Sequence, residues 1–222
     1  EWSWAVRDTR WMRPRTLELG VIARDSKALS VTGSRECSFD CSFCTNGEMW
    51  GTGFNRVNVT KVVDEIEFLM KGYDVDTFSF SDLMLPPKMT EPFCNEILER
   101  GIKANFFPLM SVVPGKTPWA LMKKAGFIEV GIGVEIPSDI RTGIGKRFSY
   151  QVVKDFIRGA TEAGILVKLF LIIGFPHEES EDSVVNSYLA ALKELMPHFL
   201  RIHFATPFPG TKDWVTYCDR RY

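Results

Sequence analysis

Residues 166–173 read LVKLFLII, a nearly continuous apolar run with a single charge at Lys168. A strand with one solvated face would alternate polar and apolar residues, so this run predicts a strand that is covered on both faces, as in a parallel sheet. Residues with helical spacing follow between positions 180 and 196. We therefore expect a buried strand and a covering helix in this part of the chain.

The same alternation of strand and helix patterns extends in both directions from this run. The expected strands are residues 28–33, 77–82, 104–110, 128–134, 166–173 and 199–205. The expected helices are residues 60–71, a helix capped by Thr90 with Pro92 in its first turn, residues 117–126, a helix capped by Ser149, and residues 180–196. Repeated βα units predict parallel strands joined by helical crossovers. A closed barrel has eight units and about 250 residues, so we expect an α/β fold, a partial (β/α)6 TIM-like barrel with helices outside, with a doubly wound sheet as the alternative.

Length and charge exclude several classes of protein. The chain has 222 residues, and 27 Lys and Arg balance 28 Asp and Glu for a net charge of −1, which gives no electrostatic basis for binding nucleic acid. No apolar run approaches the roughly 18 residues of a membrane span, and no secretory signal opens the sequence. We expect a cytoplasmic protein with residues 1–26 as an N-terminal extension or linker and residues 27–222 as one core domain.

Three of the five cysteines, Cys37, Cys41 and Cys44, lie within the stretch CSFDCSFC directly after the first expected strand. Thiolates are the usual ligands of iron–sulfur clusters, and three of them would leave one iron open for a small molecule. The alternative is a structural zinc site, which would need a fourth Cys or His nearby. The spacing favours a cluster and leaves Cys94 and Cys218 as packing or bystander thiols.

The motif CSFDCSFC resembles the CxxxCxxC signature of the radical S-adenosylmethionine (SAM) superfamily. Further segments resemble that family in the same order, and they are residues 57–69 (VNVTKVVDEIEFL), 78–83 (FSFSDL), 133–139 (GVEIPSD) with 145–146 (GK), 172–176 (IIGFP) and 206–211 (TPFPGT). The set is most like the branch that carries a cobalamin-binding domain. The sequence departs from the family at Ile136 and Pro137, where Ser-Gly is common.

The resemblance implies a [4Fe-4S] cluster on Cys37, Cys41 and Cys44, with SAM chelating the open iron. Residues expected to contact SAM are Phe43, Ser79, Ser81, Asp82, Glu135, Lys168, Gly174 and Thr206. Strand alternation places Lys168 inside the barrel and puts Arg201 and His203 on one face of the last strand, where they would line the substrate. The alternatives are a surface or capping role for Glu135, snorkelling at a strand edge for Lys168, plain packing for Phe43 and His203, and a simple turn at Gly174. Residues 79–82 could equally belong to a half-buried strand. No particular residue is assigned to the catalytic step itself.

The implied activity is reductive cleavage of SAM to a 5′-deoxyadenosyl radical, which abstracts hydrogen from a substrate. We expect methyl transfer within a longer cobalamin-dependent enzyme, with cobalamin bound by a domain outside these residues. The alternatives are a cyclase or rearrangement enzyme and a non-catalytic iron–sulfur scaffold. Expected partners are a small-molecule or peptide substrate and an electron donor of the flavodoxin or ferredoxin type.

Overall fold

The computed structural model describes residues 26–35, 37, 39–51, 55–56, 58–80, 85, 87–112, 115, 117–137, 144–146, 148–175 and 181–218. The expected N-terminal extension therefore lies almost wholly outside the described residues, and so do Ser81 and Asp82.

The strands of the barrel are parallel and belong to two sheets. The first has the order β1-β4-β5, with bounds Ala28–Val31, Thr77–Phe80 and Asn105–Phe107. The second has the order β6-β7-β8-β9, with bounds Leu109–Met110, Glu129–Glu135, Leu166–Ile173 and Phe199–Phe204. Within each sheet, neighbours in space follow one another along the chain, as in a barrel and unlike a doubly wound sheet, whose strand order reverses. The expected open α/β barrel is confirmed.

Pro108 separates the two sheets. The sequence predicted one strand over residues 104–110, but the structure has two short strands, β5 and β6, on either side of this proline. Proline has no backbone N–H to donate, so it interrupts a ladder of strand hydrogen bonds. The connection continues through an isolated bridge between Phe106 and Phe127 and a hydrogen bond from the Gly131 N–H to the Pro108 carbonyl, 2.9 Å.

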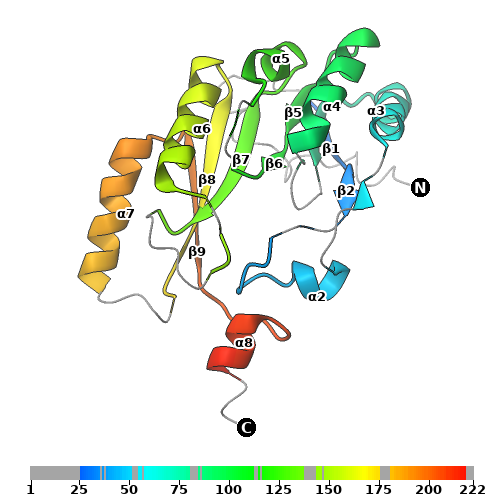
Figure 1. The fold of residues 1–222 in the computed structure, drawn as a ribbon. Coiled ribbons are helices and arrows are strands. Elements are labelled where there is room, and N and C mark those ends of the chain that lie inside the picture. The colour runs from blue at the N-terminus through cyan, green and yellow to red at the C-terminus, as the bar shows by residue number, and fades with distance from the viewer. Residues whose placement is uncertain are drawn as a thin grey trace.

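Helices cover the outer face of the strands (Figure 1), and in the described part of the chain their bounds are α3 Val59–Tyr73, α4 Pro87–Glu99, α5 Trp119–Lys124, α6 Tyr150–Glu162 and α7 Glu181–Leu195. Alternate residues of β8 point toward them, and Val167, Leu169 and Leu171 are fully buried. The opposite face of β8 carries Lys168, Phe170 and Ile172, which face the interior of the barrel. The long apolar run at residues 166–173 thus has a packed outer face and an inner face that reaches the site.

The helix boundaries agree with the sequence in part. Ser149 caps α6, where its side chain accepts a hydrogen bond from the Val152 N–H at 3.4 Å. The prediction that Thr90 caps α4 is wrong, because the helix begins at Pro87 and Thr90 is buried inside it. Pro87 suits the first position of a helix, where no N–H is needed. Pro92 consequently lies in the interior of α4 and not in its first turn.

Short elements that the sequence did not predict surround the cysteine segment. An antiparallel pair of two-residue strands, β2 (Ser34–Arg35) and β3 (Asn55–Arg56), brackets it. The helix α2 (Asn46–Trp50) follows Cys44, and α8 (Lys212–Tyr217) follows β9. The helices α2 and α8 lie near the carboxyl ends of the strands, in the lower part of Figure 1.

In the described part of the chain, β1 and β9 are the outermost strands and no pairing joins them. The barrel is therefore open between these strands. No helix within the described residues is both long and apolar enough to cross a membrane.

Candidate active site

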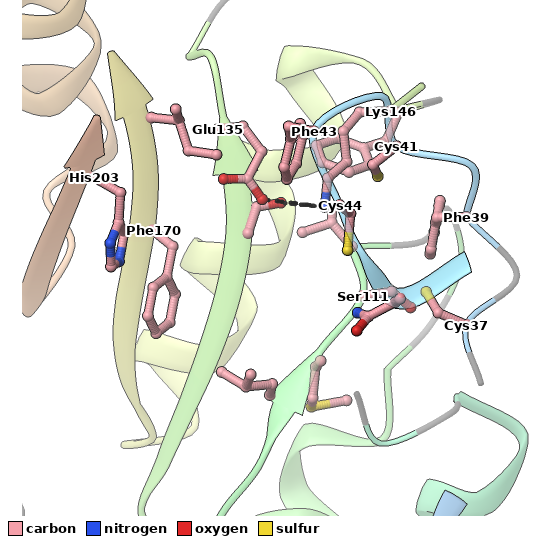
Figure 2. Close-up of a pocket in the computed structure, with 17 residues that line it drawn as sticks. Cys37, Phe39, Cys41, Phe43, Cys44, Ser111, Glu135, Lys146, Phe170 and His203 are labelled. Atoms are coloured by element: carbon pink, nitrogen blue, oxygen red, sulfur yellow. Dashed lines mark hydrogen bonds and ion pairs between the residues drawn. The ribbon is translucent and has the colours of Figure 1, made fainter. Parts of the chain in front are cut away.

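A cavity of about 250 Å³ opens at the carboxyl ends of the strands. Figure 2 shows the cysteine segment and Lys146 on one side of it, Phe170 and His203 on the other, and Glu135 between them. The residues that carry chemistry come from the loop after β1, from the end of β7, from the segment before α6 and from β9, and they are Cys37, Cys41, Cys44, Glu135, Lys146 and His203. Residues more than 160 positions apart in the chain thus share one site.

The loop that carries the cysteines is held by backbone contacts on two sides. The Ser42 N–H donates to the Ile144 carbonyl at 3.3 Å, and the Asp213 N–H donates to the Ser42 carbonyl at 3.1 Å. Gly145 has a φ of 79°, and a Cβ added there would lie 2.3 Å from the Asp40 carbonyl oxygen. A side chain at Gly145 would therefore push the cysteine loop out of place.

Burial raises the pKa of two of the three cavity thiols. The pKa of Cys41 rises to about 11, because burial outweighs the favourable charge of Lys146. Burial also raises the pKa of Cys37, and a backbone hydrogen bond from Phe39 and the charge of Lys146 oppose that rise. Both thiols are therefore protonated at neutral pH until a metal displaces the proton.

The donor set fits an iron–sulfur cluster better than a single metal ion. Across the described residues, no group of three Cys, His, Asp or Glu side chains is placed to hold one ion, as a structural zinc site requires. The three thiols instead line a common cavity wall. Three thiol ligands around a cavity of this size suit a cluster that is larger than one ion and keeps one iron free.

Glu135 occupies an unusual backbone position at the end of β7. Its φ is 64°, and the pairing of β7 with β8 shifts register between Gly133 and Glu135. This irregularity turns the carboxylate back over Gly133, where an added Cβ would lie 2.4 Å from Glu135 Oε1. Such conformations are strained for a residue with a side chain and persist where the surroundings hold them in place. The position thus aims a buried carboxylate into the cavity.

The carboxylate of Glu135 faces the ammonium group of Lys146, a residue to which the sequence gave no role. The two groups are 3.4 Å apart, and both side chains are largely buried. Burial raises the pKa of Glu135, while the charges of Lys146 and His203 act in the opposite direction. The sequence marked Lys146 only as part of the family-like Gly-Lys pair at residues 145–146. Its contact with Glu135 depends on how the chain folds.

Aromatic side chains form the rest of the cavity wall. Phe43 packs against Phe175 with ring centroids 5.9 Å apart, and Phe170 stacks on His203 at 6.2 Å with an angle of 11° between the rings. A second cavity of about 400 Å³ shares Phe43 and His203 with the first and is also lined by Thr206. Phe43, His203 and Thr206 therefore lie along one continuous surface.

Other residues expected at the site lie outside these cavities. The Ser79 hydroxyl is 2.6 Å from that of Ser30 on the neighbouring strand. Gly174 follows β8 with a φ of 84° and has open space around it. Arg201 shares the face of β9 that carries His203 but lies two residues before it, toward the start of the strand.

The structure does not bring Lys168 to the cavity. Its ammonium group forms an ion pair with Glu129, the first residue of β7, and lies over the ring of Phe199 at 5.7 Å. Strand alternation correctly predicted that Lys168 faces the barrel interior. Lys168 lies near the start of β8 and therefore at the amino end of the barrel. There it pairs with the buried carboxylate of Glu129 and not with a carboxylate of SAM or substrate.

Comparison with known proteins agrees with this site. The Radical SAM superfamily profile matches residues 31–187. The chain is 29% identical to an uncharacterized methyltransferase, PH0819, of Pyrococcus horikoshii over 83% of this chain and 40% of that protein. It is 28% identical to the anaerobic magnesium-protoporphyrin IX monomethyl ester cyclase of Rubrivivax gelatinosus over 79% of this chain and 32% of that protein. The chain thus spans less than half the length of these relatives.

The fold is also similar to that of solved structures. The radical SAM methyltransferase TsrM of Kitasatospora setae, with tryptophan and a SAM analogue bound, matches with a TM-score of 0.77 at 19% identity, over 87% of this chain and 39% of that one. The profile covers well over half of the chain and includes the three cysteines and Glu135. This chain belongs to the radical SAM superfamily.

Proposed function

We propose that this chain is the catalytic core of a radical SAM enzyme that transfers methyl groups within a longer, cobalamin-dependent protein. The observation that carries the proposal is the convergence of Cys37, Cys41 and Cys44 with Glu135 on one cavity at the carboxyl ends of parallel strands. Catalytic groups of barrel enzymes lie at this end. [4Fe-4S] and SAM are the cofactors of this family.

Several residues in and around the cavity have a proposed task. The three cysteines would hold the cluster, which together with bound SAM supplies the one-electron chemistry that generates a 5′-deoxyadenosyl radical. Glu135 would accept hydrogen bonds from SAM, and Phe43 and Thr206 would contact SAM in the adjoining cavity. The aromatic wall of Phe43 and Phe175 would keep water from the reacting groups. Ser79, Ser81, Asp82 and Gly174 are proposed as further SAM contacts from the strand ends.

The substrate would approach from β8 and β9. His203 lines both cavities and stacks on Phe170, and Arg201 extends the same face. These residues would line a small-molecule or peptide substrate. A flavodoxin- or ferredoxin-type protein would donate the electron. An odd number of cysteines, three of them within one short motif, suits a metal cluster in a reducing, cytoplasmic location better than a disulfide framework.

Methyl transfer is the favoured reaction because methyltransferases recur among the relatives. They include PH0819 and a hopanoid C-3 methylase of Methylococcus capsulatus, which is 23% identical over 84% of this chain. A cyclase is the second candidate, since the relative from Rubrivivax gelatinosus carries that name at nearly the same identity.

Anaerobic reconstitution with iron, sulfide and a strong reductant tests the core of the proposal. The wild-type chain should show a [4Fe-4S] spectrum that changes when SAM is added, and it should release 5′-deoxyadenosine. Cys41→Ala should lose both the cluster and SAM cleavage. Cys218→Ala is the matched control and should behave as the wild type does. A cluster that does not respond to SAM, with no cleavage product, would support the non-catalytic scaffold instead.

The products of SAM distinguish methyl transfer from cyclisation. With methylcobalamin and a cobalamin-binding domain supplied, a methyltransferase should also accumulate S-adenosylhomocysteine. Release of 5′-deoxyadenosine alone, with no methylated product, would favour the cyclase.

A further inference from the structure

Lys146 is a largely buried cation, and four contacts fix its position in the cavity. Its side chain is 12% exposed. The ammonium group lies 3.4 Å from Glu135 Oε1 and donates a hydrogen bond to the Gly133 carbonyl at 3.2 Å. It also lies 5.6 Å from the ring centre of Phe39 and 5.9 Å from that of Phe148. Favourable contacts with a carboxylate, a carbonyl and two ring faces hold the charge at one place.

That place faces the cysteines. Lys146 lines the same cavity as the three thiols (Figure 2). The backbone places Lys146 beside the cysteine loop, because the preceding residue, Gly145, packs directly against the backbone of Asp40 and Cys41. A side chain at Gly145 would separate Lys146 from the cysteine loop.

The other interior lysine that the structure describes cannot take this place. Lys168 forms its ion pair with Glu129 at the amino end of the barrel. Lys146 and Glu135 are the two oppositely charged side chains that line the cavity together with the three thiols.

A charge at this position affects how readily a cluster is reduced. Reduction adds one electron, and hence one negative charge, to the cluster without making or breaking a bond to the cysteines. A cation nearby stabilises the reduced form, and a carboxylate nearby destabilises it. Partial burial strengthens both effects, because little water screens them.

We propose that Lys146 is a positioning residue that holds Glu135 over Gly133 and raises the reduction potential of a cluster bound by Cys37, Cys41 and Cys44. The inference rests on the proposed function, since it requires that cluster. The ion pair would thus both hold Glu135 in place and affect the reduction potential of the cluster, with Lys146 raising that potential and Glu135 lowering it.

The test is a potentiometric titration of the reconstituted chain, monitored by electron paramagnetic resonance in the absence of SAM, with dithionite as the electron donor. Lys146→Met should shift the cluster to a more negative potential, and Lys146→Arg should restore most of the wild-type value. Lys154→Met is the matched control. Lys154 also pairs with a glutamate, Glu194, and lies over a tyrosine ring, but on the outer helices α6 and α7. Its loss should leave the potential unchanged.

Glu135→Gln provides an independent measurement in case Lys146→Met does not fold. Removing the carboxylate leaves the full charge of Lys146 acting on the cluster, so the potential should become less negative. A fully loaded cluster with the wild-type potential in Lys146→Met would overturn the inference. An unchanged potential in Glu135→Gln would also overturn it. Failure of the wild-type chain to assemble any cluster would instead refute the proposed function, so the two failures are distinguishable.

Discussion

Gly133 and Glu135 show how a single missing Cβ can determine the geometry of the site. The carboxylate of Glu135 lies in the space that a side chain at residue 133 would fill. The register shift between the two residues is what brings the carboxylate there. Residue 133 must therefore be glycine because the carboxylate of Glu135 approaches it closely, and not because of its own backbone φ.

Gly133→Ala should therefore displace the carboxylate from Lys146. We expect SAM-dependent product formation to fall to background and unfolding free energy to fall by about 1–3 kcal/mol, as for other overpacked sites. Gly72→Ala is the control, because residue 72 lies in α3 with open space around it. That change should raise stability by about 0.5–1 kcal/mol. Wild-type activity in Gly133→Ala would contradict the placement of Glu135.

Cys94 predicts a loss of stability at alkaline pH. Burial on α4 raises its pKa from 9.0 to about 12, and the nearby charge of Glu91 acts in the same direction. Since the folded protein holds this proton more tightly, the stabilisation is complete below pH 9.0 and is lost as the pH rises toward 12. Across this window the unfolding free energy should fall by about 1.4 kcal/mol per pH unit.

Urea denaturation of the wild-type chain and of Cys94→Ala at several pH values from 8 to 11 measures this slope. The variant should be less stable at pH 8 and should have the shallower slope. Equal slopes in the two proteins would show that Cys94 does not couple folding to pH.

At the residue scale, the sequence predicted which residues line the cavity where local spacing carries the information. The three cysteines share one loop, so their proximity in the cavity follows from the chain itself. Lys146 could not be assigned a role, because its place beside Glu135 depends on how two separate segments meet. Lys168 faces the predicted side, but its depth in the barrel depends on the length of β8 and on Glu129.

At the scale of elements, the helices with strong apolar periodicity matched the sequence pattern, and the prolines caused the errors. Pro92 resembles a first-turn proline, yet Pro87 already begins α4. Pro108 divides what reads as one strand. The short elements β2, β3, α2 and α8 have too few residues to show a period, so the sequence could not reveal them.

The cap of α8 is expected to affect the cluster. The Thr211 side chain accepts a hydrogen bond from the Trp214 N–H at 3.1 Å and donates one to the Phe208 carbonyl at 2.7 Å. The cap orients the α8 residue Asp213, whose N–H binds the Ser42 carbonyl. Thr211→Ala should therefore loosen the cysteine loop and speed the loss of reconstituted cluster to a chelator.

Ser149→Ala is the matched control, because it removes a comparable cap, the hydrogen bond to the Val152 N–H of α6, without altering the contact between Asp213 and Ser42. Each substitution should cost about 1 kcal/mol of unfolding free energy. Only Thr211→Ala should change the rate of cluster loss, and Thr211→Ser should restore it. Equal rates in both alanine variants would show that α8 does not support the loop.

At the scale of the whole molecule, the alternation of strands and helices predicted the open barrel. It did not predict that the outer face of the last strand, β9, is exposed. The outer face of β9 is apolar and exposed, with Ile202 at 51% and Phe204 at 78% exposure. The neighbouring helix α7 exposes Val185 and Leu189. Apolar side chains clustered at a strand edge favour association.

The purified chain should consequently self-associate as its concentration rises, which sedimentation velocity measures. Ile202→Lys should shift the distribution toward monomer. Phe68→Lys is the control, because Phe68 is equally apolar and exposed but lies on α3, on the other side of the barrel (Figure 1). A wild-type chain that stays monomeric at every concentration would contradict this interpretation.

The backbone contacts of the cysteine loop have a consequence for how the protein responds to oxidation by air. Ser42 bonds to Ile144 on one side and to Asp213 on the other, so this loop joins the segment before α6 to the segment after β9. Oxidation of Cys41 or Cys44 to bulkier, charged forms would strain both connections at once. Oxygen damage at the thiols should therefore also appear as proteolytic cleavage around α8, well before the barrel itself unfolds.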